Sequence, residues 1–258
     1  MSVDVHHRLD GPEDAPVLVL SNSLGTANRM WDENLPGLVE RFRVLRYDTR
    51  GHGESPAPPG PYTVEELAGD ALALLDSLGI ERVLWAGVSL GGMTGLWLAA
   101  NAPECIERLA ACCTAAHLPP AEMWADRAAT ARGEGMGTLT VAALERWFSP
   151  AYTESAPEVI ERFRADLLAT PPEGYASCCE AIGRHDLRDK LGAITAPTLV
   201  VAGGDDPATP PDKAEEIAAG VPDARLEVLP GARHLANVER ADEVTGMLLD
   251  HLGAGART

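Results

Sequence analysis

A serine between two glycines is the residue of this 258-residue chain best placed to do covalent chemistry. Ser89 is the centre of the segment GVSLG at residues 87–91, which follows the apolar run 83–86 and precedes a small-residue helical pattern over 92–100. The bare motif also occurs in ordinary turns, but a strand before it and a helix after it favour a nucleophile. A side chain at either glycine would collide with a neighbouring strand or helix. The pattern therefore predicts a serine presented at a sheet edge, at the positive end of a helix.

A serine hydroxyl is a weak nucleophile and needs a base, which is usually a histidine because its pKa lies near neutral pH. A carboxylate then orients the histidine, and on a strand–turn–helix elbow the chain order is serine, acid, histidine. Of the seven histidines, His234 has the expected place, after the last predicted strand and before the final helix. His6 and His7 precede the core, and His52 comes before the serine. His117 and His185 bracket the central helical block, and His251 lies in the last helix.

Two neighbouring aspartates compete for the role of the acid. Asp205 and Asp206 both follow the predicted strand 198–202, in the turn GGDDP. Position along the chain alone does not separate them, and the one that is not catalytic would be solvated or would cap the turn.

The negative oxygen formed during attack by a serine needs two backbone N–H donors. Leu90, directly after the nucleophile, supplies the first. The second is expected from the loop after the first long strand, which reads NSLG at residues 22–25, and counting back from Trp31 selects Leu24. An ordinary turn is the alternative interpretation of this segment.

The elements that must position these residues alternate between strands and helices in the first third of the chain. Apolar runs predict strands, and Thr63 with Glu66 forms a capping box that begins a helix ending near Gly79. Strands are expected at 17–20, 42–47, 83–86, 106–113, 198–202 and 226–229, and helices at 122–132, 139–147, 158–168, 174–182 and 241–252, before a frayed tail at 253–258. This rhythm predicts an α/β fold with a mostly parallel sheet flanked by helices. Residues 1–116 and 191–258 would form the core, and 117–190 an inserted helical cap.

Composition narrows the classes of partner. A net charge of −18 repels nucleic acid and anionic membranes, so neither is expected as a partner. The N-terminal segment has no basic and apolar signal pattern, no apolar run reaches about 18 residues, and the five cysteines read as reduced thiols. These features predict a cytoplasmic protein. No group of His, Cys or carboxylate residues has metal-binding spacing, so no metal is expected.

The order Ser89, acid, His234 with a helical insert before the acid resembles the α/β-hydrolase fold over nearly the whole chain. Several segments are similar to 3-oxoadipate enol-lactonases of the β-ketoadipate pathway: SNSLGT at 21–26 with Met30 and Trp31, RYDTRGHG at 46–53, PPGPYT at 58–63, GVSLGGM at 87–93, ERWF at 145–148 and DPATPP at 206–211. The resemblance selects Asp206, directly before the proline, as the acid. It implies hydrolysis of a small cyclic enol ester, 3-oxoadipate enol-lactone, through an acyl-enzyme on Ser89 without a cofactor, in catechol and protocatechuate degradation.

The substrate implied by this resemblance carries a free carboxylate, which an acidic protein must bind with a local cation. Arg127 and Arg132 of the first cap helix are candidates because arginine can bind a carboxylate through two parallel hydrogen bonds. Either could instead be a solvated surface residue, and Trp147 could contact the lactone ring or fill the core of the cap.

The same three catalytic residues would also suit a general carboxylesterase or a cofactor-free perhydrolase or haloperoxidase. A non-catalytic ligand-binding member of the fold would normally lack one of them.

Overall fold

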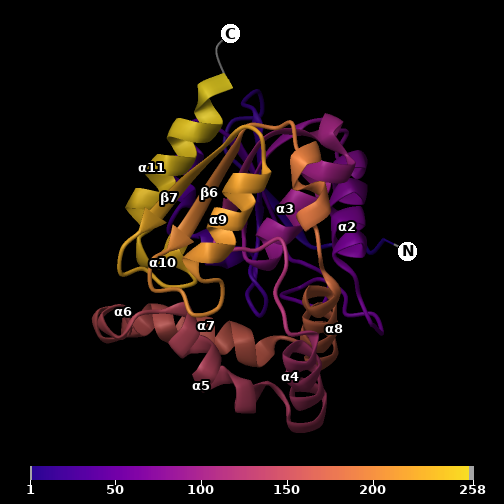
Figure 1. The fold of residues 1–258 in the computed structure, drawn as a ribbon, viewed down its shortest axis with the longest axis vertical. Helices are drawn as coiled ribbons and strands as arrows, with labels where there is room; N and C mark the ends of the chain where they lie inside the picture. Colours follow the sequence, from indigo (N-terminus) through magenta and orange to yellow (C-terminus); the bar gives the residue numbers. More distant parts are fainter. Residues whose placement is uncertain (1, 256–258) are drawn as a thin grey trace.

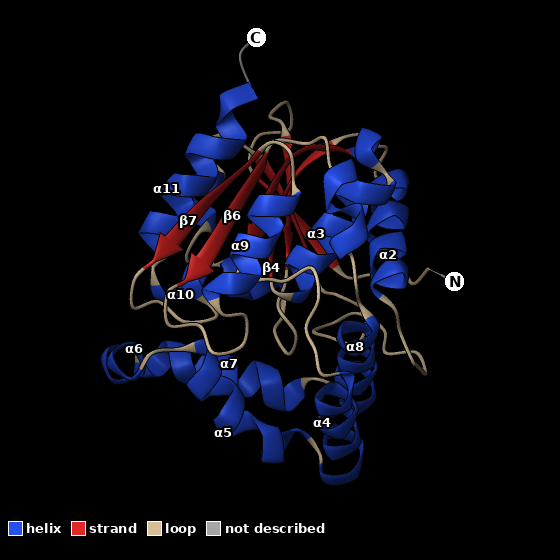
Figure 2. Ribbon diagram, in the orientation of Figure 1, coloured by secondary structure: helices blue, strands red, loops and turns tan. Residues whose placement is uncertain are grey.

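A computed structural model describes residues 2–255 and contains one seven-stranded sheet in the order β1-β3-β2-β4-β5-β6-β7 (Figure 2). The strands are β1 (His7–Asp10), β2 (Val17–Ser21), β3 (Arg43–Tyr47), β4 (Val83–Val88), β5 (Ile106–Cys112), β6 (Thr198–Gly203) and β7 (Ala224–Leu229). β1 pairs antiparallel with β3, and all the other pairs are parallel. The predicted α/β fold with a mostly parallel sheet is therefore confirmed.

Helices cover both faces of the sheet because successive side chains of each buried strand point to opposite sides. Leu18 and Leu20 of β2 join one apolar cluster, whereas Val19 joins the other. The cluster with Leu18 includes side chains of α1 (Leu35–Leu38) and α11 (Ala241–Leu252). The cluster with Val19 includes side chains of α2 (Val64–Ser77), α3 (Leu90–Asn101) and α9 (Pro211–Gly220). The sheet is thus packed on both faces, and the carboxyl ends of its parallel strands lead into loops.

Several helices and one strand of the structure were not predicted from the sequence. β1 is a polar edge strand of sequence HRLD, so His7 belongs to the sheet rather than preceding the core. His6 stands just before it and hydrogen-bonds Asp48 at 3.0 Å. Helix α9 and the short α6 (Pro150–Ser155) and α10 (Ala236–Glu239) were not predicted either. The capping box of α2 is present as expected. Of the predicted tail, residues 253–255 form a 3-10 turn and 256–258 lie outside the described residues.

Five helices lie together beyond the carboxyl ends of the strands (Figure 1). They are α4 (Ala121–Glu134), α5 (Met136–Trp147), α6, α7 (Pro157–Ala169) and α8 (Pro172–Arg184), and they are called the cap helices below. An isolated bridge between His117 and Asp186 joins the segments that lead into and out of this group. The division into a core and a cap at residues 117 and 190 stays a proposal.

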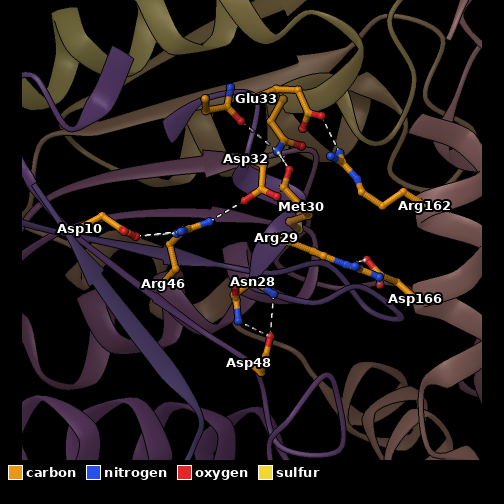
Figure 3. A network of polar contacts seen from close by, with 12 residues as sticks. Asp10, Asn28, Arg29, Met30, Asp32, Glu33, Arg46, Asp48, Arg162 and Asp166 are labelled. Carbon is orange, nitrogen blue, oxygen red and sulfur yellow. Dashed lines mark hydrogen bonds and ion pairs between the residues drawn. The ribbon is translucent and has the colours of Figure 1, made fainter. Parts of the chain in front are cut away.

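Ion pairs join the cap helices to the loop after β2 (Figure 3). Arg29, in the 3-10 helix η1 (Asn28–Trp31), forms a bidentate pair with the buried Asp166 of α7. Arg162, which also lies in α7, forms an ion pair with Glu33, with 2.5 Å between Arg162 Nη2 and Glu33 Oε1. This loop begins with residues 22–25, the predicted oxyanion segment. The two ion pairs therefore attach α7 to the loop that carries this segment. Within residues 2–255, no helix has the length and apolar character needed to cross a membrane.

Candidate active site

Ser89 sits at a sharp turn between β4 and α3. Its backbone has φ 54° and ψ −113°, a left-handed conformation that is strained for a residue with a side chain. Hydrogen bonds on both sides hold it, from its own N–H to the Cys112 carbonyl at 2.9 Å and from the Thr114 hydroxyl to its carbonyl at 2.7 Å. Strain of this kind points the serine side chain away from the strand and the helix that flank it.

The two glycines of the motif are required by close backbone approach. A Cβ at Gly87 would lie 2.2 Å from the carbonyl oxygen of Gly91, and a Cβ at Gly91 would lie 2.4 Å from the carbonyl oxygen of Ser21. The first contact is with the start of α3 and the second with the neighbouring strand β2. The collision predicted from the sequence is therefore the reason for both glycines.

His234 and Asp206 come together from two loops at the carboxyl ends of β6 and β7. His234 Nδ1 lies 2.8 Å from Asp206 Oδ2, and both side chains are almost completely buried. Asp206 also accepts hydrogen bonds from the N–H groups of Ala208 and Thr209 and from the Thr209 hydroxyl. The carboxylate is thus fixed at both oxygens, and it orients the His234 ring with Nε2 facing away from it.

Burial and the neighbouring polar groups have opposite effects on the pKa of Asp206. Burial alone would raise the pKa, but the charge of His234 and the hydrogen bonds from His234 and Thr209 outweigh burial, so the pKa lies below its usual value. The carboxylate is therefore ionised at neutral pH. Asp205, by contrast, is exposed, and its backbone N–H bonds the Ala232 carbonyl at 3.0 Å. The geometry brings Asp206 and not Asp205 to His234.

Leu24 and Leu90 offer backbone N–H groups that have no hydrogen-bond partner among residues 2–255. Both residues are buried, at 7% and 1% exposure. Buried N–H groups are almost always paired in folded proteins, so two free donors on neighbouring segments are unusual. A hydrogen bond of 3.0 Å from the Gly91 N–H, in the first turn of α3, to the Asn22 carbonyl joins the helix to the loop after β2. This arrangement suits an oxyanion hole.

His52 fixes the loop that carries Leu24. Its Nε2 accepts a hydrogen bond of 2.9 Å from the Gly25 N–H, and its Nδ1 donates to the Arg50 carbonyl at 3.2 Å. Burial lowers the pKa of His52 to about 4, although the bond to Arg50 opposes this shift. The ring is therefore neutral at pH 7 and keeps its acceptor for Gly25.

One cavity joins the predicted catalytic residues to the cap helices. Ser89, His234 and Leu24 line it from the core side. Its other lining residues are Ser23, Leu118, Trp124, Arg127, Ala143, Arg146, Trp147, Tyr175, Ile182, Ala208 and Thr209. Ser89 and His234 share no hydrogen bond within the described chain, and such contacts often tighten only when substrate is bound.

The structure separates the cap residues predicted from the sequence. Arg127 and Trp147 line the cavity, and the Arg127 guanidinium lies 4.6 Å from the centroid of the Trp124 ring. Trp147 also packs edge-on against Phe163 at 6.2 Å between ring centroids, so it belongs both to the cavity wall and to the core of the cap. Arg132 points elsewhere and pairs with Glu173 at 2.8 Å and Glu180 at 2.7 Å. The expectation that Arg132 binds substrate is therefore not supported by its position.

Arg146 is a cavity residue that the sequence analysis missed. It lies in α5 directly before Trp147, within the segment ERWF that carried part of the resemblance, so that segment held the available signal. Burial lowers the pKa of Arg146, and the nearby positive charge of Arg127 lowers it further. Within the described residues, neither Arg127 nor Arg146 forms an ion pair with a carboxylate. Two guanidinium groups in an acidic protein are thus left facing the cavity.

The end of α5 is bonded directly to the loop that carries His234. The Leu235 N–H donates to the Trp147 carbonyl at 3.1 Å, and the Arg233 guanidinium donates to the Glu145 carbonyl. The end of α5 is therefore attached directly to the loop that carries the predicted general base.

The sheet order, the elbow at Ser89 and the helical insertion between β5 and β6 together define a known class. Residues 16–241 match the family described as alpha/beta hydrolase fold, and the chain belongs to this family. It is 40% identical over 238 residues to 3-oxoadipate enol-lactonase 2 of Acinetobacter baylyi, across 92% of this chain and 89% of that protein. The enol-lactonase structure from Burkholderia xenovorans LB400 matches with a TM-score of 0.95 and 47% identity over 97% of both chains.

Other relatives carry a different description. A putative carbamate hydrolase, RutD of Stutzerimonas stutzeri, is 33% identical over 257 residues, covering 98% of this chain and 96% of that protein. The resemblance to enol-lactonases predicted from the sequence is confirmed, and the protein is a hydrolase of the alpha/beta class.

Proposed function

We propose that this hydrolase opens 3-oxoadipate enol-lactone to 3-oxoadipate in aromatic degradation, using Ser89, His234 and Asp206 and no cofactor. The observation that carries the proposal is a pair of guanidinium groups, Arg127 and Arg146, that line the same cavity as Ser89 and have no carboxylate partner among residues 2–255. A cation in this position suits an ester whose acyl part bears a carboxylate. The similarity to enol-lactonases over most of the chain supports the same substrate.

The reaction begins when His234 Nε2 takes the proton of the Ser89 hydroxyl as the serine oxygen attacks the lactone carbonyl. The N–H groups of Leu24 and Leu90 bind the negative oxygen of the tetrahedral intermediate. Collapse breaks the bond between the carbonyl carbon and the ring oxygen, and His234 gives its proton to the leaving enolate oxygen, which becomes an enol. The ester is cyclic, so the leaving group stays attached to the acyl-enzyme. A water activated by His234 then releases the open-chain product and restores Ser89.

Proton transfer in this scheme depends on Asp206. Its carboxylate keeps the proton of neutral His234 on Nδ1, so that Nε2 is the free base. It also stabilises the imidazolium that forms. The cap helices roof the cavity and present Arg127 and Arg146 to the carboxylate of the substrate, while Trp147 forms an apolar wall beside it. The partner in this account is a small-molecule lactone, and cytoplasmic residence is part of the proposal.

Replacing the cavity arginines is expected to weaken action on the anionic substrate alone. Arg146→Ala and Arg127→Ala should each lower kcat/KM for the enol-lactone, mainly through KM, by the equivalent of about 1.5–3 kcal/mol for a hydrogen bond to a charged group. Steady-state kinetics with the enol-lactone, its methyl ester and p-nitrophenyl acetate measure this difference. The two neutral esters should be hydrolysed by the variants about as well as by the wild type.

Arg132→Ala is the matched control, because Arg132 shares α4 with Arg127 but is occupied by Glu173 and Glu180. It should leave the preference between anionic and neutral esters unchanged. Equal losses on charged and neutral esters from both cavity variants would contradict the assigned role and show that these arginines only support the cap.

A further inference from the structure

Ser23 has a buried hydroxyl group that no other part of the described chain satisfies. The residue is 3% exposed, and its Oγ has no hydrogen-bond partner among residues 2–255. Buried polar atoms without partners are rare in folded proteins, and each one needs an explanation. Eight such side-chain atoms occur in the described chain, on Asn22, Ser23, Trp31, Glu33, Arg162, His185, Glu216 and Asn237. Of these residues, only Ser23 lines the cavity that contains Ser89.

The rest of the Ser23 residue is fully engaged, so its position is fixed. Its backbone N–H contacts the Met30 sulfur at 3.3 Å, and its carbonyl accepts from the N–H and the hydroxyl of Thr26 at 3.2 and 2.8 Å. The next residue is Leu24, whose free N–H is part of the proposed oxyanion hole. A rigid loop therefore presents one unpaired hydroxyl and one unpaired N–H side by side in sequence at the same cavity.

We propose that the Ser23 hydroxyl is a further catalytic group, donating a hydrogen bond to the negative oxygen of the tetrahedral intermediate beside the Leu24 and Leu90 N–H groups. This inference rests on the proposed serine mechanism. Folding leaves the hydroxyl unpaired at the cost of stability, since a buried polar group without a partner is unfavourable. The developing oxyanion then supplies the missing partner. Its negative charge is absent in the bound ester and builds up in the transition state that leads to the tetrahedral intermediate, so the bond favours turnover over ground-state binding. The proton stays on Ser23 throughout.

Ser23→Ala tests this role through rate and stability together. The variant should lower kcat by about 10²-fold, as the loss of one oxyanion donor does, with KM little changed. Both acylation and deacylation should slow, because each passes through a tetrahedral oxyanion. Stopped-flow burst kinetics with p-nitrophenyl acetate separate the two steps. The melting temperature should stay equal or rise, since the variant removes an unsatisfied buried group.

Ser21→Ala is the matched control, two residues away on the same segment. The Ser21 hydroxyl is buried but already hydrogen-bonded to the Tyr47 hydroxyl at 2.9 Å, and Ser21 does not line the cavity. This variant should therefore lower the melting temperature and keep kcat. Ser23→Ala should thus be slower without loss of stability, whereas Ser21→Ala should be less stable without loss of rate. A purely structural role for Ser23 would not produce this contrast.

Three results would overturn the inference: unchanged kcat in Ser23→Ala, slowing of deacylation alone, or a lower melting temperature that shows the hydroxyl has a partner within the protein. The result is independent of the substrate proposed above. If the wild type hydrolysed p-nitrophenyl acetate but not the enol-lactone, the substrate proposal would fail and the Ser23 measurement would still stand on p-nitrophenyl acetate. If Ser89→Ala retained activity, the serine mechanism itself would fail.

Discussion

Ser89→Ala is expected to lower kcat for ester hydrolysis by about 10⁶-fold, because removal of the nucleophile from a Ser-His-Asp unit costs nearly as much as removal of all three residues. Some activity above the uncatalysed rate should remain, since the oxyanion donors and the cavity are still present. Alanine has the same Cβ as serine, so it meets the same backbone strain at φ 54° and should leave the elbow in place. Steady-state rates at saturating substrate, with circular dichroism to confirm folding, measure the effect.

A covalent probe gives the companion result for the same residue. A serine-directed phosphonate should label the wild-type protein once, at Ser89, and should not label Ser89→Ala. Chelation by EDTA should leave the wild-type rate unchanged, because every step of the proposed mechanism uses groups of the chain itself. Full activity of Ser89→Ala, or inactivation by EDTA, would contradict the serine mechanism.

Asp206→Asn is expected to lower kcat by about 10⁴-fold while the fold is retained. An amide at this position donates as well as accepts, so it can hold His234 with its proton on Nε2, and the ring then cannot take the proton of Ser89. Loss of the carboxylate charge also leaves the imidazolium unsupported. The hydrogen bonds that Ala208 and Thr209 make to the side-chain oxygen can still form in the variant, which favours an intact loop.

The adjacent aspartate provides the control for this prediction. Asp205 is exposed and does not contact His234, so Asp205→Asn should leave kcat nearly unchanged. Rates of both variants measured across pH 5 to 9 separate a change in chemistry from a change in stability. The reverse ranking of the two variants would assign the acid role to Asp205.

The sequence was informative where function depends on local geometry. The elbow at Ser89 follows from glycines that cannot carry a Cβ, and this constraint is visible in the spacing of the motif alone. His234 was selected by its order along the chain, because loops at the carboxyl ends of parallel strands converge. Asp206 required more, because two adjacent aspartates have the same local pattern. The resemblance to a known family was needed to select Asp206, and in the structure the fold turns it toward His234.

The cap shows where sequence patterns stop being sufficient. Arg132, Arg127 and Arg146 all lie in helices that periodicity predicts, but which face of each helix meets the cavity depends on how the cap helices pack on one another and on the core. Arg132 turns toward Glu173 and Glu180 of α8, and Arg146 turns inward. The edge strand β1 was missed for a related reason. A strand with one exposed edge and polar side chains has no apolar run to reveal it.

The central expectation is that the enol-lactone is the preferred substrate of this hydrolase. The measurement is kcat/KM of the purified wild-type protein for enzymatically generated 3-oxoadipate enol-lactone, followed spectrophotometrically beside its methyl ester and p-nitrophenyl acetate. A value for the anionic lactone at least about tenfold above that for its methyl ester, matching the contribution of one charge-assisted hydrogen bond, is the predicted result. Turnover of the neutral esters far above that of the enol-lactone would contradict the account and point to a general esterase on the same catalytic residues.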